Sequence, residues 1–341
     1  MIAVTGATGH LGNTLTRLLC ERGERVRCLV LPGEDIGPLR GLGVKISRGD
    51  VRDVDSLITA FTGVRTAYHL ASVISLLPGR TELLQSVNVG GTRNVIEACR
   101  RCNVSRLVYV SSIHAFAEPP HGTMIDETTP IDPASIPAAY GKSKAEATRL
   151  VLAAAGAGLD AVVACPTGII GPFDFLGSEM GHLFRLYMRR KMPAYVDGAY
   201  DFVDVRDVAD GLIAVAERGR RGEVYILSGE LITVEEILAT LSRLTGIRPP
   251  RLKLPAWLAG LAADAATALS RLRGGRPLFT RESLAILRSN ALVSHAKATR
   301  ELGWQPRPIR DSIADTVRWL KVEEDFLISP GKVGAVRSQG E

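Results

Sequence analysis

Short, fully apolar runs alternate with longer amphipathic stretches over the first half of the chain. The apolar runs have the length of buried β-strands, and the stretches between them repeat apolar positions with the period of a helix. This pattern predicts strands at residues 1–5, 25–31, 44–47, 66–70, 106–110 and 161–165, separated by helices at 11–21, 53–61, 82–102 and 138–155. Such alternation is typical of an α/β protein with a doubly wound parallel sheet, whose ligands bind at the carboxyl ends of the strands.

The pattern loosens after Cys165. It predicts a loop at 166–174, a helix at 181–190, a strand at 202–205 leading into a helix at 206–218, a strand at 224–227, and mainly helical segments at 234–246, 256–272, 280–287 and 309–326. We therefore expect a sheet domain over 1–165, to which 203–228 returns, and a smaller, mainly helical region made of 166–202 and 229–326. A polar tail at 327–341 is expected to be flexible.

A glycine-rich turn, Gly6-Ala7-Thr8-Gly9-His10-Leu11-Gly12, joins the first predicted strand to the first helix. Gly6 allows the tight turn, Gly9 lets the backbone approach a phosphate, and Gly12 allows close packing of the helix on the strand. The free N–H groups at the start of the helix favour an anion. The placement of the motif predicts a dinucleotide site, although its spacing differs from G-x-G-x-x-G.

Tyr140 and Lys144 are four residues apart in a predicted helix, so their side chains lie on one face. A phenol with its reference pKa of about 10 is a poor base at neutral pH, and a nearby ammonium group stabilises the phenolate. The pair can then exchange a proton with a substrate oxygen. This spacing occurs by chance in many helices, but the other candidates all follow strand ends: Asp50-Val51, His69-Leu70-Ala71-Ser72 and Ser111-Ser112. That coincidence favours a catalytic pair over a surface pair.

Charge and cysteine content exclude several other classes of protein. The 42 Lys plus Arg exceed the 36 Asp plus Glu by a net charge of +6, which is spread along the chain without a nucleic-acid-binding motif. We expect no nucleic-acid partner, whereas a basic cleft for an anionic cofactor is compatible with this charge. The five cysteines are scattered, and Cys99 and Cys102 lack the second pair that a zinc site needs. No disulfide framework and no metal site are predicted.

The start of the chain reads as a strand and lacks the charged and apolar regions of a signal peptide, so we expect a cytoplasmic protein. The most apolar long window, 255–272, contains Asp264 and is too short to span a bilayer comfortably. We interpret it as an amphipathic helix, with contact to a membrane surface as the alternative.

Taken together, these motifs resemble an extended short-chain dehydrogenase/reductase of the NAD-dependent epimerase/dehydratase superfamily, over about residues 1–326. The resemblance rests on residues 5–12, 49–53, 69–72, 88–94, 110–112, 140–144 and 202–208. The chain is most similar to the branch that contains dihydroflavonol reductases, 3β-hydroxysteroid dehydrogenases and hopanoid-associated epimerase-like proteins. The implied fold is a Rossmann-type domain with a smaller, mainly helical substrate-binding region.

The resemblance also implies a role for each matching residue. Tyr140 would be the acid/base, Lys144 would bind the nicotinamide ribose and lower the pKa of Tyr140, and Ser112 would hydrogen-bond the substrate oxygen. The expected substrate contacts are Ser112, His114 and Tyr200. The expected cofactor contacts are Gly6, Gly9, His10, Leu11 and Gly12 at the pyrophosphate, Leu31, Asp50 and Val51 at the adenosine, Leu70, Ala71 and Ser72 in the trough, Tyr140 and Lys144 at the ribose, and Pro166 and Ile169 at the nicotinamide. The cofactor supplies the hydride.

Several polar residues have a structural alternative. Ser111 is a weaker candidate than Ser112 for the serine that hydrogen-bonds the substrate oxygen. The alternative is that its hydroxyl is buried and bonded to the backbone. Asn88 would join a proton relay or bond a helix backbone. His114 would face substrate or support a residue that does, while His69 is expected to be a structural hydrogen-bonder. The charged residues at 126–127 and 204–207 are expected to fix loops and helix starts.

The end of the second predicted strand departs from the usual cofactor pattern. There an acidic side chain binds the ribose hydroxyls of NAD, and an arginine binds the 2′-phosphate of NADP. This chain reads Cys28-Leu29-Val30-Leu31-Pro32, with neither. Loss of the acid removes repulsion of the phosphate, which favours NADP and leaves NAD as the alternative.

Two further departures concern the substrate. Sugar-nucleotide enzymes of the family usually carry an arginine where this chain has Tyr200, and a Val-Tyr-Gly where it has Ala115-Phe116-Ala117. Both changes add apolar surface, which suits a bulky, uncharged substrate. Trp257, Leu258 and Leu261 would cover such a molecule or pack as an ordinary helix.

Three functions remain open from the sequence. The first is an NAD(P)-dependent oxidoreductase that interconverts a ketone and a secondary alcohol on a hydrophobic, steroid-like or flavonoid-like substrate. The second is a nucleotide-sugar epimerase or dehydratase with tightly bound NAD, and the third is a non-catalytic dinucleotide sensor. In the resembling family the helices matching 82–102 and 138–155 commonly pair across a dimer, so a homodimer is expected.

Overall fold

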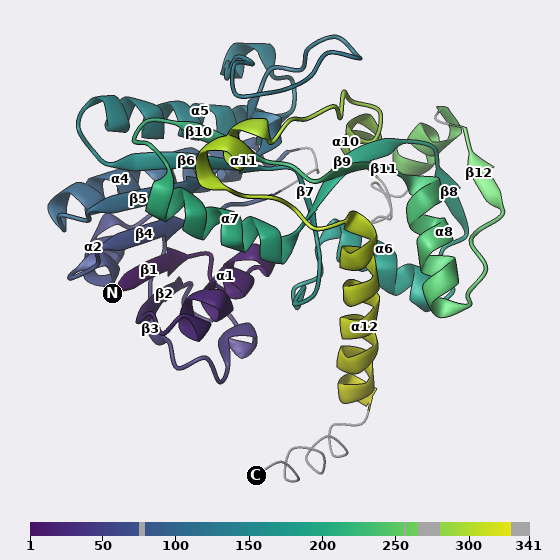
Figure 1. Cartoon of the computed structure of the whole chain (residues 1–341), viewed down its shortest axis with the longest axis horizontal. Coiled ribbons are helices and arrows are strands. Elements are labelled where there is room, and N and C mark those ends of the chain that lie inside the picture. The colour runs from purple at the N-terminus through teal and green to yellow at the C-terminus, as the bar shows by residue number, and fades with distance from the viewer. Residues whose placement is uncertain (75–78, 256, 265–279, 329–341) are drawn as a thin grey trace.

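A seven-stranded parallel sheet forms the centre of the larger part of the molecule in a computed structural model (Figure 1). The structure describes residues 1–74, 79–255, 257–264 and 280–328. The strand order is β10-β6-β5-β4-β1-β2-β3. These strands are β1 (Ile2–Thr5), β2 (Val26–Val30), β3 (Lys45–Arg48), β4 (Thr66–His69), β5 (Arg106–Val110), β6 (Ala161–Pro166) and β10 (Val224–Leu227).

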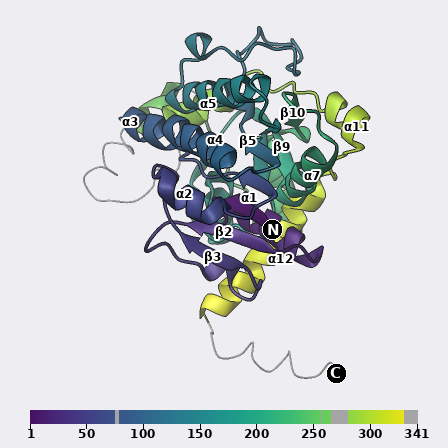
Figure 2. The same cartoon turned by 90° about the vertical axis from the view of Figure 1, so that its left-hand side faces the viewer.

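The inner strands are mostly apolar and almost completely buried because helices cover both faces of the sheet. Helices α1 (His10–Glu21) and α7 (Val205–Arg218) pack together on one face. Figure 2 shows α2 (Val54–Phe61), α4 (Gly91–Arg101) and α5 (Ala139–Gly156) side by side on the other face. The prediction of a doubly wound parallel sheet is confirmed. The order reverses at β1, which lies between β2 and β4, so the ends of these strands open a crevice for a ligand.

The long helix predicted at 82–102 is not a regular α-helix. It consists of α3 (Thr81–Leu84), a π-helical turn at Gln85–Gly90 and then α4. The wider turn carries Asn88, whose side chain bonds to the backbone of Val73 and to Ser143. The residue pattern that predicts a helix does not reveal this π-helical turn, because a single wide turn spans too few residues to change the period of the whole segment.

Apart from the strand predicted at 202–205, the short strands of the smaller part were not predicted from local sequence. Strand β7 (Gly168–Ile170) lies within the segment predicted as a loop, and it pairs with β9 (Ala199–Asp204), which also pairs with β11 (Glu230–Thr233). Strand β8 (Ala194–Val196) pairs with β12 (Leu252–Leu254). Three residues are too few for a periodic pattern, and the partners are distant in the chain.

Helices α6 (Glu179–Met188), α8 (Val234–Thr245), α10 (Arg281–Ile286) and α12 (Ile309–Ile328) belong to the smaller part, whereas α11 (Ala296–Leu302) packs on α7 and β10 of the larger part. Short 3₁₀ turns occur at Gly37–Leu39, Ile113–Ala115 and Pro133–Ser135. The sequence did not predict α11. Helix α12 packs against α8 and β9, below the junction of the two parts in Figure 1.

Two predicted segments lie partly outside the described residues. Of the helix predicted at 256–272, residues 257–264 are described and are helical. Of the predicted tail at 327–341, only 327 and 328 are described, at the end of α12.

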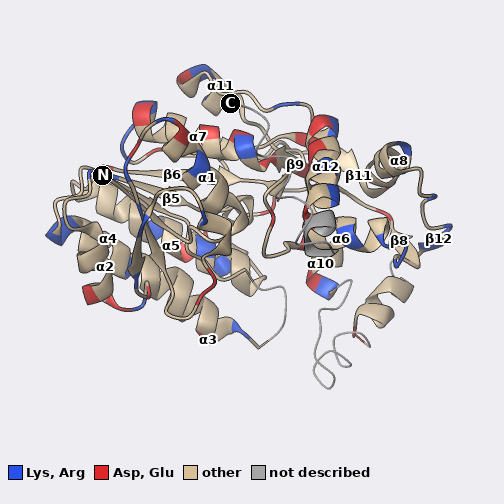
Figure 3. Cartoon of the chain, turned by 90° about the horizontal axis from the view of Figure 1, so that it is seen from below, with Lys and Arg blue, Asp and Glu red and all other residues tan. Residues whose placement is uncertain are grey.

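None of the described helices is both long and apolar enough to cross a membrane. Acidic and basic residues both occur on α7, α11 and α12, which carry red and blue segments in Figure 3.

Candidate active site

A cavity of about 740 Å³ opens at the carboxyl ends of β1, β2, β4, β5 and β6 and continues between the helices of the smaller part. This volume lies in the range of small-molecule and cofactor sites. Every cofactor, catalytic and substrate residue expected from the sequence lines this cavity. They are Gly6, Gly9, His10, Leu11, Gly12, Leu31, Asp50, Val51, Leu70, Ala71, Ser72, Ser112, His114, Tyr140, Lys144, Pro166, Ile169 and Tyr200.

The glycine-rich turn fits the phosphates of a dinucleotide. Gly6 has φ +70°, and a Cβ there would lie 2.7 Å from the backbone nitrogen of Ala71. A Cβ on Gly12 would lie 1.9 Å from the carbonyl oxygen of Gly6, so the start of α1 packs directly on the turn. Gly9 precedes α1 without a capping side chain, and the first turn has no acidic residue. The helix therefore presents free N–H groups and a positive dipole end to the cavity.

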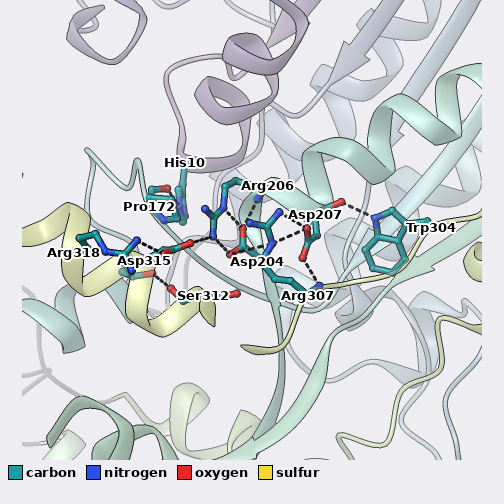
Figure 4. A network of polar contacts seen from close by, with 11 residues as sticks. His10, Pro172, Asp204, Arg206, Asp207, Trp304, Arg307, Ser312, Asp315 and Arg318 are labelled. Atoms are coloured by element: carbon teal, nitrogen blue, oxygen red, sulfur yellow. Dashed lines mark hydrogen bonds and ion pairs between the residues drawn. The ribbon is translucent and has the colours of Figure 1, made fainter. Parts of the chain in front are cut away.

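His10 uses its side chain to link this turn to a distant loop. Its Nε2 lies 2.9 Å from the carbonyl oxygen of Pro172, and because a carbonyl only accepts, Nε2 carries the proton. Figure 4 shows the ring beside Pro172. Burial lowers the pKa of His10, despite the nearby Asp174 carboxylate. The imidazole is thus neutral, and its Nε2–H is already committed to Pro172.

Tyr140 and Lys144 lie one turn apart on α5, and both are buried. Burial raises the pKa of Tyr140 to about 12, although a hydrogen bond with Ser112 acts in the opposite direction. Burial lowers the pKa of Lys144 to about 7, and its Nζ donates a 2.7 Å hydrogen bond to the carbonyl oxygen of Val110. From the sequence, Lys144 was expected to lower the pKa of Tyr140. In the structure burial raises this pKa instead, so Tyr140 is a protonated phenol at neutral pH.

The two candidate serines have different environments. The O–H group of Thr148 donates its proton to the carbonyl oxygen of Lys144. In the 2.6 Å hydrogen bond between Ser111 and Thr148, the donor is therefore the O–H group of Ser111. The hydroxyl of Ser112 instead accepts from the backbone N–H of His114, and its own hydrogen bond is made with the Tyr140 hydroxyl at the cavity. Ser112 is therefore better placed than Ser111 to hydrogen-bond a substrate oxygen.

His114 and Tyr200 form a polar pair next to Tyr140. The Tyr200 hydroxyl lies 3.1 Å from Nε2 of His114, and the two rings stack with centroids 5.9 Å apart. The His114 ring meets the Tyr140 ring edge-on at 6.2 Å. Burial lowers the pKa of His114 to about 4 and raises the pKa of Tyr200. Both groups are therefore neutral hydrogen-bonding partners at physiological pH.

Asn88 and His69 are fully engaged below the cavity surface. The amide of Asn88 bonds to Val73, Ser143 and the hydroxyl of Ser72, using both its oxygen and its nitrogen. The ring nitrogens of His69 lie 2.8 and 3.1 Å from the hydroxyls of Thr5 and Thr92. Burial lowers the pKa of His69 to about 3. His69 thus bonds the hydroxyls beside it, and the side chain of Asn88 joins the loop after β4 to α5 through Val73 and Ser143, without a bond to a helix backbone among the described residues.

An acidic residue at the adenosine end of the cavity was missed from the sequence. Glu34 lines the cavity four residues beyond β2, and its carboxylate accepts hydrogen bonds from the Thr8 hydroxyl and the Leu31 N–H. Glu34 lies beyond the strand end at Leu31-Pro32, where such an acid is usually found. The signal for it in the sequence is an acidic residue directly after Gly33, which favours a tight turn.

Ten apolar residues of the smaller part form the far wall of the cavity, which we call the apolar chamber. They are Met180, Leu183, Met192, Val196, Ile232, Val234, Ile237, Leu238, Ile286 and Leu287. Ile232 pairs in register with Tyr200, so this chamber begins beside the His114–Tyr200 pair. Trp257, Leu258 and Leu261, for which covering a substrate and ordinary helix packing were both open, are exposed and do not line the described cavity. Ala259 and Ala263 of the same helix pack onto Val196 and Leu284.

The charged residues at 126–127 and 204–207 lie outside the cavity. Glu127 accepts a hydrogen bond from the N–H of Ile226, and Asp204 caps the start of α7. Asp204, Arg206, Asp207, Arg307 and Asp315 form an ionic network that joins α7 to α12 (Figure 4). Among the described residues, no group of three or more His, Cys, Asp or Glu is arranged to hold a metal ion.

Comparisons with known proteins agree with this geometry. Residues 2–228 match the model of the NAD dependent epimerase/dehydratase family. The chain is 37% identical over 322 residues to sterol demethylase protein B of Methylococcus capsulatus, covering 93% of this chain and 97% of that protein. It is 34% identical over 322 residues to a putative dihydroflavonol 4-reductase of Synechocystis, covering 93% and 94%. The crystal structure of gox2253 superposes with a TM-score of 0.82 at 35% identity, covering 95% of this chain and 98% of that one.

Proposed function

This chain belongs to the NAD-dependent epimerase/dehydratase family of extended short-chain dehydrogenase/reductases, which are NAD(P)-dependent enzymes, and on that basis we propose its reaction. The reaction is the interconversion of a ketone and a secondary alcohol on a bulky, hydrophobic, ring-bearing substrate. The single observation that carries the proposal is the apolar chamber, which continues directly from Tyr140 and Tyr200. A chamber of this kind favours burial of an apolar ring system.

The charges around the cavity argue against a sugar nucleotide. Arg52 and Lys144 are the only Lys or Arg among the described residues that line it. Arg52 lies at the adenosine end and is paired with Asp50, while Lys144 bonds to Val110 beside Tyr140. A substrate diphosphate would need cationic or N–H partners in the apolar chamber, and the described chamber wall offers no cation.

The chain's own residues supply the proton and the geometry, and a bound nicotinamide cofactor supplies or accepts the hydride. In the reducing direction Tyr140 donates its phenolic proton to the substrate oxygen. Ser112 donates a hydrogen bond to the same oxygen and holds it beside Tyr140. Lys144 binds the ribose of the cofactor and stabilises the phenolate that remains. The His114–Tyr200 pair contacts a polar group of the substrate at the mouth of the apolar chamber.

The names of the two relatives support this substrate class. One name refers to a sterol and the other to a dihydroflavonol, and both are hydrophobic ring systems. Identities of 37% and 34% over nearly the whole chain include the helices that form the apolar chamber. We therefore propose a steroid-like or flavonoid-like substrate for this chain.

Cofactor-dependent turnover tests the proposal. Purified protein would be incubated with NADH or NADPH and a panel of 3-ketosteroids and dihydroflavonols, with UDP-glucose as the comparison and Tyr140→Phe as the matched variant. We expect oxidation of the reduced cofactor with a ring ketone, and its loss in Tyr140→Phe. Epimerisation of UDP-glucose by protein that retains NAD would instead support the sugar-nucleotide function. Cofactor binding without turnover of any compound would support the sensor.

We also propose a homodimer that pairs through the α3–α4 segment and α5, which lie side by side on one outer face of the sheet. Sedimentation equilibrium at micromolar concentration should then give twice the mass of one chain. A single-chain mass under these conditions would exclude this dimer.

A further inference from the structure

A tight turn after β2 brings an acidic side chain back to the glycine-rich turn. Gly33 has φ +81°, and the N–H of Glu34 donates to the carbonyl oxygen of Leu31 at 3.1 Å. This geometry folds Glu34 over the strand end. One carboxylate oxygen accepts from the Thr8 hydroxyl at 2.5 Å, and the other accepts from the Leu31 N–H at 3.1 Å. The carboxylate thus bridges the ends of β1 and β2.

The position of this carboxylate is the adenosine end of the cavity. β1 and β2 are parallel neighbours, with Thr5 opposite Leu29, so the two strands end side by side. Thr8, Leu31, Glu34 and Asp50 all line the cavity there. In dinucleotide-binding folds an acid at this place accepts the ribose hydroxyls of NAD, and an arginine takes the 2′-phosphate of NADP. The residue at the strand end itself, Leu31, can do neither.

We propose that Glu34 replaces the missing strand-end acid and makes this protein select NAD(H) over NADP(H). An ionised carboxylate has about four acceptor positions, so two remain for the ribose 2′- and 3′-hydroxyls after Thr8 and Leu31 are satisfied. A 2′-phosphate would bring about two negative charges against the same carboxylate. This inference rests on the cofactor site of the proposed function and removes the ground for expecting NADP.

The nearby cations do not compensate for that repulsion. Arg48 donates from one nitrogen to the carbonyl oxygens of Leu31 and Glu34, at 2.9 and 3.0 Å, and does not line the described cavity. Arg52 is paired with the Asp50 carboxylate at 2.5 Å. Arg17 donates to the carbonyl oxygen of Pro38 and lies over the ring of Phe173. Arg52 is thus paired with an acid, whereas Arg48 and Arg17 keep their charge but are held by backbone carbonyls and do not line the described cavity. Among the described residues, Glu34 is therefore the unpaired charged group that faces the ribose site.

The test is fluorescence titration of the purified full chain with NADH and with NADPH, in the absence of substrate. We expect NADH to bind at least tenfold more tightly. In Glu34→Gln the amide keeps the size of the side chain without its charge, and the ratio of the two dissociation constants should fall at least tenfold, mainly through tighter NADPH binding. The matched control is Asp35→Asn, which removes the same charge from an exposed neighbour that caps the N–H of Gly37. Its ratio should equal that of the wild type.

Because the readout is a ratio within one protein sample, partial loss of folded protein affects both cofactors equally. Tighter binding of NADPH by the wild type, or an unchanged ratio in Glu34→Gln, would overturn the role of Glu34 and leave the proposed reaction standing. Binding of neither cofactor would overturn both. Preferential binding of NADH without turnover of any ketone would support the role of Glu34 and would contradict the proposed class of substrate.

Discussion

The hydroxyl of Tyr200 and Nε2 of His114 lie 3.1 Å apart in the buried wall of the cavity, and among the described residues neither side chain has another hydrogen-bonding partner. Removing one member leaves the other buried without a partner. That cost is about 1–3 kcal/mol, larger than the net gain from an ordinary hydrogen bond. Loss of either side chain alone should therefore destabilise the site more than the net strength of their hydrogen bond suggests.

Tyr200→Phe should lower the free energy of unfolding by about 1–3 kcal/mol, because Nε2 of His114 then lacks its partner. Urea unfolding measures this change. The control is Tyr195→Phe, which removes a hydroxyl that bonds to Glu235 at an exposed position and should have little effect. The double variant Tyr200→Phe with His114→Phe should be more stable than the two single effects predict when added. Strict additivity would show that the two side chains are not coupled.

The pH dependence of the two reaction directions should differ, because burial raises the pKa of Tyr140 to about 12. Reduction of a ketone uses the protonated phenol, which stays the dominant form from pH 6 to 9. Its rate should fall over this range only as Lys144 loses its charge, because burial lowers the pKa of Lys144 to about 7. Oxidation of the alcohol uses the phenolate, and its rate should rise nearly tenfold per pH unit over that range. Tyr140→Phe should lower turnover by about 10²–10⁴-fold and preserve cofactor binding. An oxidation rate that is already constant at pH 6 would place the working pKa of Tyr140 below that pH.

Asn88 should contribute to stability through its side-chain nitrogen, which donates to the carbonyl oxygen of Val73 and to the hydroxyl of Ser143. Asn88→Asp replaces this donor with an oxygen that faces the same carbonyl. We expect a loss of about 2–3 kcal/mol in the free energy of unfolding, measured by urea titration. Asn94→Asp is the control, because Asn94 makes a single donation to the carbonyl oxygen of Val51 and is partly exposed. A larger loss in Asn94→Asp would contradict this ranking.

The sequence predicts the large sheet well because its information is local. The inner strands are short runs that are buried on both faces, and each is separated from the next by a helix with one apolar face. β7 shows the limit of this information. Its three residues acquire their strand conformation from β9, where Gly168 lies opposite Phe202, and nothing within residues 166–174 encodes that partner.

The candidate site also contains residues that the sequence predicts and contacts that it does not. Residues at strand ends, such as Ser112, and residues at a fixed helical spacing, such as Tyr140 and Lys144, could be placed on one cavity from sequence. The hydrogen bond from His10 to Pro172 joins residues 162 positions apart. The contact of Glu34 with the glycine-rich turn depends on the positive φ of Gly33. Such contacts depend on the packing of whole elements, so they appear only in three dimensions.

The C-terminal helix should depend on Arg307 for its attachment to α7. The Arg307 guanidinium donates twice to the Asp207 carboxylate, at 2.7 and 2.9 Å, and the Arg307 N–H donates to it once more. The indole N–H of Trp304 donates to the carbonyl oxygen of the same aspartate (Figure 4). Asp207 is buried, so loss of the guanidinium leaves its charge poorly compensated.

Arg307→Met should therefore lower the free energy of unfolding by about 3 kcal/mol, measured by urea titration at pH 7. The matched control is Arg318→Met on α12. Arg318 also pairs with an aspartate at 2.7 Å, but its side chain is 74% exposed, so water screens that pair and its loss should change stability little. High salt should not reduce the effect of Arg307→Met, because a buried pair is weakly screened. Equal effects of the two substitutions would mean that burial of Asp207 does not strengthen the contact, and that α12 is held by its apolar face instead.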